Sequence, residues 1–219
     1  MREETKQPFA KLKRFIEPQP KQRSREKCEF CGVEIVEKHS HAVNTETRSL
    51  MCVCRPCYLL FTREGAARGK FKAVPERYLY APGLILTDAQ WNRLQIPVGI
   101  AFFFFNTSLG RMVVFYPSPV GATESLLSLE TWDELARTNP LLATLAADVE
   151  ALLVRNVQRR GGFECYIVPI DACYELVGRI RRRWKGFDGG EEAWQEIDAF
   201  FTDVRGRSTE VNPEAVIAR

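Results

Sequence analysis

The hydrophobic positions in the second half of the chain predict three β-strands. Two β-rich runs, VGIAFFFFN (98–106) and RMVVFYPS (111–118), are joined by TSLG, and Gly110 can supply the turn of a hairpin. A third run, FECYIVPI, covers residues 163–170. The four consecutive phenylalanines at 102–105 cannot all lie on one face of a strand. We therefore expect this strand to be central, or covered on its other face by a partner or by the N-terminal part of the chain.

Helical spacing of apolar residues predicts the other elements of this half. Thr87 and Gln90 form a capping-box pattern at the start of one helix, and Asp171 can cap another. A longer segment begins near Pro140 and places its leucines and valines on one helical face. The expected helices cover residues 87–94, 129–138, 140–158, 172–187 and 191–204.

The order of these elements predicts an α+β fold, with a small, mostly antiparallel sheet that has its helices on one face. Cysteines and histidines are concentrated in residues 28–57, so we expect a small zinc-ribbon-like metal module before this sheet. The chain divides into a basic arm expected to be disordered (1–26), a cysteine- and histidine-containing metal module (27–75), an α+β domain (76–206) and a frayed tail (207–219).

Composition is that of an ordinary globular protein. Hydrophobic residues make up 45% of the 219 positions and charged residues 27%. The longest apolar run, residues 98–105, is much shorter than the roughly 18 residues needed to span a bilayer. The N-terminus carries charges where a signal peptide would be apolar. We therefore expect a cytoplasmic protein, in which clustered cysteines bind metal rather than form disulfides.

Charge is unevenly distributed, although the net charge is only +3. Residues 1–27 carry a net charge of +5, whereas residues 73–219 carry −4. A basic arm beside a metal knuckle permits nucleic-acid binding, as does the basic run around Trp184 (178–187). A solvated tail and a solvated helix face explain the same charges, so nucleic acid is the less favoured partner.

Thirty consecutive residues hold five of the seven cysteines and both histidines. Cys28 and Cys31 form a CxxC knuckle followed by Gly32, and Cys54 and Cys57 form a second CxxC. Two such pairs at this separation are typical of a tetrahedral metal site. We expect the four thiolates to bind one metal ion.

His39, His41 and Cys52 are the remaining ligands in this stretch. The histidines are two residues apart, so both rings point to the same face if the segment is a strand. Three alternatives stay open. The first is a second, more open metal site, and the second is a mixed site in which a histidine replaces one thiolate. In the third, the histidines hydrogen-bond to metal ligands or lie on the surface, and Cys52 packs as a small buried apolar residue.

Zinc is the expected cofactor, because a module of this size lacks an adequate core without a bound ion. Iron is the alternative, because four thiolates also suit iron and CEFCG resembles a rubredoxin knuckle. Cys57, however, precedes Tyr58 rather than the glycine usual in rubredoxin. Paired knuckles with Asn44 are superficially similar to an HNH endonuclease, yet the segment after the second knuckle lacks the histidine and further ligands that this fold requires.

Longer stretches resemble one protein family. They comprise CEFCG, KHSHAVN, RSLMCVCRPCYLLF, IPVGIAFFFF, VVFYPSPVGATES, VPIDACYELVGRIRRRWKGFDGG and WQEIDAFF. With these motifs the chain resembles an uncharacterised bacterial family whose genes lie in operons for oxygen-tolerant, hydrogen-scavenging nickel-iron hydrogenases. The resemblance implies an accessory role in hydrogenase assembly or electron transfer and supplies no catalytic residue. It marks the same five cysteines and two histidines, which are Cys28, Cys31, His39, His41, Cys52, Cys54 and Cys57.

We therefore expect a non-enzymatic, metal-binding accessory protein that docks on a protein partner, such as a hydrogenase subunit or maturation factor. Two alternatives remain. One is a rubredoxin-like iron electron carrier, and the other is a zinc-ribbon regulator that binds nucleic acid through the basic arm.

Overall fold

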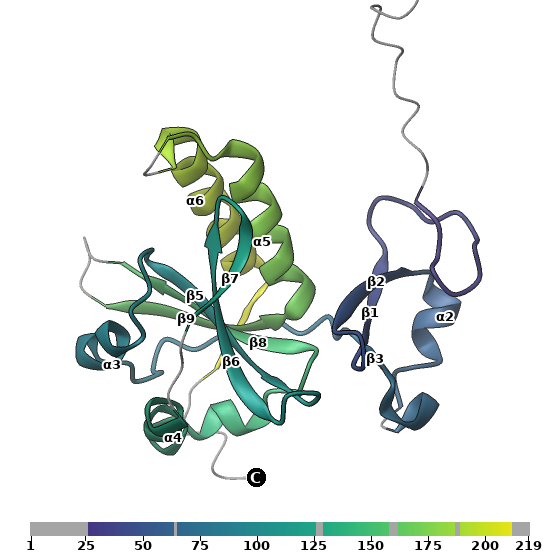
Figure 1. Cartoon of the computed structure of the whole chain (residues 1–219), viewed down its shortest axis with the longest axis horizontal. Coiled ribbons are helices and arrows are strands. Elements are labelled where there is room, and N and C mark those ends of the chain that lie inside the picture. Colours follow the sequence, from purple (N-terminus) through teal and green to yellow (C-terminus); the bar gives the residue numbers. More distant parts are fainter. Residues whose placement is uncertain (1–25, 64, 126–128, 158–161, 187–188, 212–219) are drawn as a thin grey trace, which may run out of the picture.

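A computed structural model describes residues 26–63, 65–125, 129–157, 162–186 and 189–211. The expected basic arm lies outside the described residues except for residue 26, and so does the expected tail beyond residue 211. Figure 1 shows a small sheet formed by the first part of the described chain beside a larger sheet with its helices.

The small sheet is three-stranded, with the order β2-β1-β3 and antiparallel neighbours. A short helix follows β2, and a 3-10 helix precedes β3. Its elements are β1 (Ser40–Asn44), β2 (Ser49–Val53), α2 (Arg55–Leu59), η1 (Ala66–Gly69) and β3 (Phe71–Ala73).

The larger sheet is seven-stranded, with the order β10-β4-β9-β8-β5-β6-β7. All neighbours are antiparallel except β10 and β4, which confirms the expected mostly antiparallel sheet of an α+β fold. The predicted hairpin forms between β5 and β6, and Gly110 has a φ of +63° in its turn. The strands are β4 (Leu79–Tyr80), β5 (Ile100–Asn106), β6 (Arg111–Ser118), β7 (Gly121–Ser125), β8 (Glu150–Asn156), β9 (Phe163–Pro169) and β10 (Thr209–Glu210).

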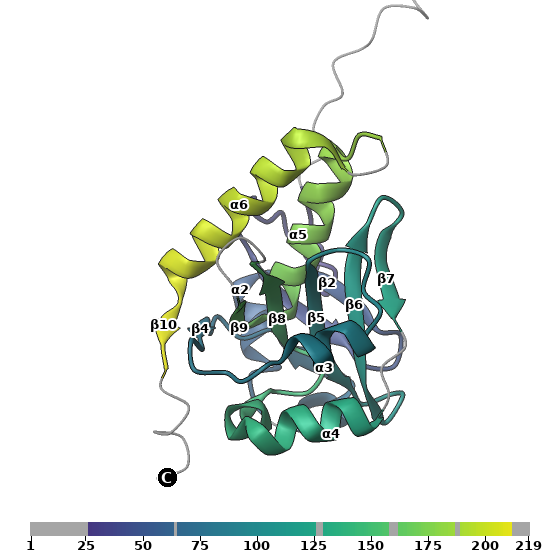
Figure 2. The same cartoon turned by 90° about the vertical axis from the view of Figure 1, so that its left-hand side faces the viewer.

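Helices cover both faces of this sheet, so the expectation of helices on one face is wrong (Figure 2). Phe102 and Phe104 of β5 pack in a core with α5 and α6, whereas Phe103 packs on the opposite face with α3, α4 and η2. Both faces must be covered because this strand is apolar on both sides. The helical elements are α3 (Asp88–Arg93), α4 (Leu129–Thr138), η2 (Pro140–Thr144), α5 (Ile170–Arg183) and α6 (Gly190–Arg207).

The predicted helix over residues 140–158 is wrong. Within residues 140–157, which the structure describes, only the short η2 is helical, and residues 150–156 form β8, between β9 and β5. Ala151 and Leu153 belong to the core on one face of the sheet, and Leu152 and Val154 to the core on the other. A run that is apolar on both faces fits a buried strand as well as a buried helix, so periodicity alone does not separate the two.

The C-terminal part also departs from expectation. Fraying was expected from residue 207, but residues 209–210 form β10, which pairs in parallel with β4. In the described part of the chain, every helix is too short or too polar to cross a membrane.

The two sheets are joined by apolar and ionic contacts. Val43 of β1 packs into the core that contains α5 and α6. Lys72 Nζ of β3 lies 2.8 Å from the buried Asp148 carboxylate. In the segment that connects β3 to β4, Arg77 donates from Nε and Nη2 to the buried Glu150 carboxylate, at 2.8 and 2.5 Å. Because buried charges are stable only when paired, these contacts fix the small sheet against the larger one.

We expect Leu153→Ala to lower the free energy of unfolding by about 2–5 kcal/mol, because it leaves a cavity in the β8 strand at the centre of the sheet. Val120→Ala is the control, because this side chain is 83% exposed, and its effect should stay within about 0.5 kcal/mol. Urea denaturation measures both. An equally small effect at Leu153 would contradict the central position of β8.

Candidate metal centre

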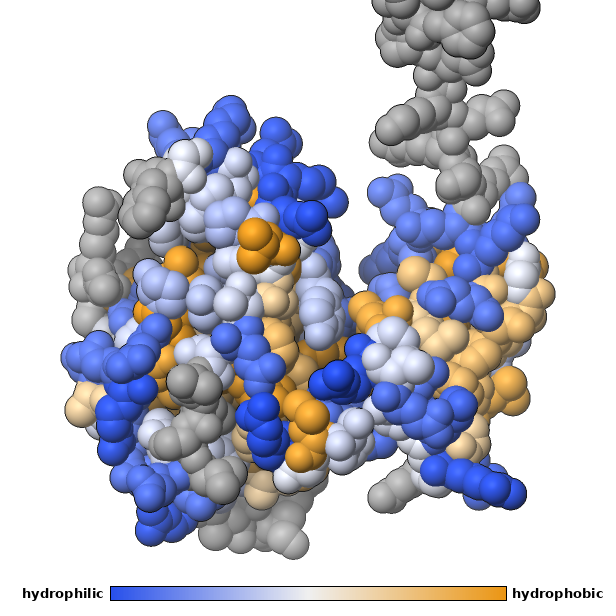
Figure 3. All heavy atoms as spheres, in the orientation of Figure 1, coloured by the Kyte–Doolittle hydropathy of each residue, from blue (hydrophilic) through white to orange (hydrophobic). Residues whose placement is uncertain are grey.

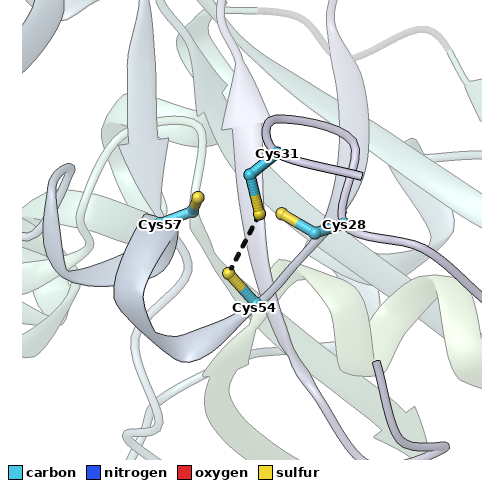
Figure 4. Close-up of side chains that lie close together, drawn as sticks. All are labelled: Cys28, Cys31, Cys54 and Cys57. Atoms are coloured by element: carbon cyan, nitrogen blue, oxygen red, sulfur yellow. Dashed lines mark hydrogen bonds between the residues drawn. The ribbon is translucent and has the colours of Figure 1, made fainter. Parts of the chain in front are cut away.

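The first knuckle is a tight turn between Cys28 and Val33. Gly32 N–H donates to the Cys28 carbonyl at 2.8 Å, and Cys28 N–H donates to the Val33 carbonyl at 2.8 Å. Gly32 has a φ of +73°, a conformation that glycine adopts without strain. The turn thereby directs the side chains of Cys28 and Cys31 toward the second knuckle (Figure 4).

The second knuckle is the start of α2. Cys54 is the N-cap residue in extended conformation, and a proline occupies the first turn. Cys57 lies inside this turn, and the Tyr58 N–H donates to the Cys54 carbonyl at 2.9 Å. The helix therefore fixes the spacing between Cys54 and Cys57.

The four thiols converge on one point (Figure 4). Their sulfur atoms all lie within 4.8 Å of one another, and the Sγ atoms of Cys31 and Cys54 are 3.6 Å apart. Two sulfurs bound to one tetrahedral zinc ion at about 2.3 Å would lie about 3.8 Å apart. Cys28 and Cys57 are buried, whereas Cys31 is exposed. The cluster can therefore bind a metal ion.

The surroundings of the cluster shift the pKa values of its thiols in different directions. Burial opposes ionisation of Cys28, but hydrogen bonds from the backbone of Cys54, Cys31 and Phe30 lower its pKa to about 6. Burial and the neighbouring thiols together raise the pKa of Cys57 to about 12. Metal binding requires thiolates, so it must displace the protons that these thiols still carry.

The other three ligands form a second group. One ligand atom each from His39, His41 and Cys52 lies within 4.8 Å of the other two. His41 and Cys52 are direct partners in the β1–β2 register, and His39 precedes β1. The two histidine rings are 4.7 Å apart between centroids. Within the described residues, the seven ligands thus form two separate groups. The four-cysteine group contains no histidine, and the other group contains both histidines and Cys52.

Asp171 is a site residue that sequence reasoning missed. It was expected to cap a helix, but the N-cap of α5 is Pro169, and no side chain caps this end. The Asp171 carboxylate instead accepts a hydrogen bond from Nδ1 of His41 at 2.8 Å. The only signal in the sequence was an acidic residue at the start of a helix, which gives no indication of a partner 130 positions away.

Asn44, Cys165 and Cys173, which could have had a catalytic or ligand role, instead have roles in a turn or in the core. The Asn44 side-chain oxygen accepts from the N–H groups of Glu46 and Thr47, which is a turn role. Cys165 and Cys173 are fully buried in the core of the larger sheet, and burial raises the pKa of Cys165 to about 12. Neither thiol is part of a ligand group.

A family model described as "Family of unknown function (DUF5947)" matches residues 27–208. The chain belongs to this family. The match includes the small sheet, every strand of the larger sheet except β10, and all seven ligand residues. No curated protein and no solved structure matches the chain. The description of DUF5947 names no activity, metal or partner.

We expect Cys31→Ser to remove the metal held by the four-cysteine cluster, because serine replaces one of its thiolates. Elemental analysis should show a loss of at least one equivalent of metal per chain. Cys173→Ala is the control, since this buried thiol lies outside both ligand groups. It should cost about 1 kcal/mol of stability and keep the metal. Retention of the metal in Cys31→Ser would contradict the four-cysteine site.

Proposed function

We propose that this DUF5947 protein is a zinc-binding, non-enzymatic accessory protein that docks on a protein partner through its metal module. The observation that carries the proposal is the convergence of four thiols from two knuckles. A site with four protein ligands leaves no position for substrate, which is typical of structural rather than catalytic zinc.

The small core of the module supports a folding role for the ion. The buried residues of this cluster are Cys28, Ala42, Val53, Cys57 and Tyr58. Two of them are metal ligands, and the other hydrophobic residues packed against them, among them Phe30 and Met51, are only partly buried. Binding of a structural zinc ion is worth about 10–16 kcal/mol in small zinc modules, which is enough to replace a missing core.

Exposed apolar side chains next to both knuckles support docking. Val33 and Val36 follow the first knuckle and are 51% and 73% exposed, and Leu59 and Leu60 follow the second and are 53% and 66% exposed. Figure 3 shows apolar residues gathered on the side of the module that faces away from the larger sheet. Such a surface is typical of a protein-binding site.

The partner that we propose is a subunit or maturation factor of a nickel-iron hydrogenase. This choice is supported by the family resemblance in the ligand and strand motifs. The exposed apolar residues fit a protein surface better than nucleic acid, which would require basic and aromatic groups there.

Zinc and iron are distinguished by elemental analysis and by colour. We expect protein purified from iron- and zinc-containing medium to contain zinc and to lack visible absorption bands, because zinc has a filled d shell. Iron with visible thiolate-to-iron bands and a reversible one-electron potential would contradict the zinc proposal and favour a rubredoxin-like carrier.

Docking is tested by the double variant Val36→Lys and Leu60→Lys. We expect its affinity for purified hydrogenase subunits, measured by isothermal titration calorimetry, to fall about tenfold or more, because two charges enter an apolar contact. Val120→Lys is the control, since Val120 is 83% exposed in the turn between β6 and β7. Equal affinities for both variants and the unchanged protein, or no binding by any of them, would contradict this docking surface.

A further inference from the structure

We propose that His39, His41 and Cys52 form a second metal site, which binds a borderline divalent cation such as Zn²⁺ and leaves one coordination position open. This inference goes beyond the proposed function, because a structural zinc module needs only its four cysteines. It rests on the hydrogen bonds, burial and strand register of these three residues.

The ring of His39 has a buried nitrogen with no hydrogen-bond partner among the described residues. The His39 side chain is only 8% exposed, and the nitrogen is Nε2. A buried polar atom without a partner costs about 1–3 kcal/mol, so a native structure normally provides one. A bound cation would be that partner.

The hydrogen bonds of both histidines determine which nitrogen faces the site. Nδ1 of His39 lies 2.9 Å from the Val36 carbonyl, which can only accept, so Nδ1 carries the proton. Nδ1 of His41 lies 2.8 Å from the Asp171 carboxylate, which likewise accepts. In each neutral ring Nε2 therefore keeps its lone pair, and this is the form in which imidazole binds a metal.

Strand pairing brings the third ligand to the same face. Cys52 of β2 is directly opposite His41 of β1, and side chains of directly paired residues lie on the same face of a sheet. The three ligand atoms are within 4.8 Å of one another. Tetrahedral zinc with two nitrogen ligands and one sulfur ligand holds them about 3.3–3.6 Å apart, so small side-chain movements close the site.

The local charge favours a cation. Nδ1 of His39 is 3.5 Å from the Glu26 carboxylate, and a Glu29 carboxylate oxygen accepts from the Cys52 N–H at 2.6 Å. Neither carboxylate belongs to the ligand group. Three protein ligands are the number found in catalytic and exchangeable zinc sites, where water or an external donor occupies the fourth position.

Asp171 is a positioning residue for this site. A carboxylate that accepts from the distal nitrogen of a metal-binding histidine fixes the ring and makes it a stronger ligand. Asp171 lies in the first turn of α5, whereas His41 lies in the small sheet. The second site therefore depends on the contact between the two sheets, and the four-cysteine site does not.

Metal stoichiometry of the full chain, saturated with Zn²⁺ and desalted, tests the proposal. We expect two equivalents in the unchanged protein and one equivalent in each of His39→Ala, His41→Ala and Cys52→Ala. Cys165→Ala, which removes a thiol outside both groups, should keep two. Asp171→Asn should weaken the second equivalent about 10–100-fold without removing the first. One equivalent in the unchanged protein, or two in His39→Ala, would overturn the proposal.

A measurement on the unchanged protein covers the case in which a variant misfolds. The chain has only two histidines, so long-range proton–nitrogen spectra contain two imidazole spin systems. The Nε2 resonances of both should shift when the second equivalent of Zn²⁺ is added. Unshifted resonances would overturn the second site and leave the four-cysteine proposal intact. Loss of metal in Cys31→Ser but not in His39→Ala would likewise overturn the second site and leave the four-cysteine site intact.

Discussion

The first part of the described chain must fold with few buried apolar residues of its own. Its sheet has a core of a few residues, two of which are the cysteines Cys28 and Cys57. Domains are stabilised by only about 5–15 kcal/mol in total, and a structural zinc ion alone supplies a comparable free energy. An ion held by four thiolates would therefore determine whether β1, β2 and β3 form at all.

Because its own core is small, the small sheet also packs against the larger sheet. Val43 packs into the core beneath α5, and Lys72 of β3 pairs with the buried carboxylate of Asp148. The same contact places the ring of His41 against Asp171. The small sheet is thus a module whose position against its neighbour also shapes its second group of ligands.

Local patterns in the sequence predicted much of the structure. The capping box of Thr87 and Gln90 forms as expected, as does the hairpin that turns at Gly110. The four cysteines of the two knuckles come together, because a CxxC spacing brings two thiols to one point within a single turn. The cap, the hairpin and each CxxC pair depend on residues that are close in the sequence, whereas the two pairs meet across a separation of 23 positions between Cys31 and Cys54.

Features that depend on distant residues were not predictable in this way. Strand β8 is apolar on both faces because it lies between β9 and β5, and its sequence alone also fits a helix. The helices cover both faces of the sheet for the same reason. The bond between His41 and Asp171 joins residues 130 positions apart, so only the folded chain reveals it.

Amide hydrogen exchange after removal of metal by a chelator tests most directly whether the ion holds the small sheet together. The amides of β1, β2 and β3 should lose their protection, while those of β5, β8 and β9 in the larger sheet should keep theirs, because the larger sheet has its own core. Unchanged protection of β1, β2 and β3 without metal would contradict a folding role for the four cysteines.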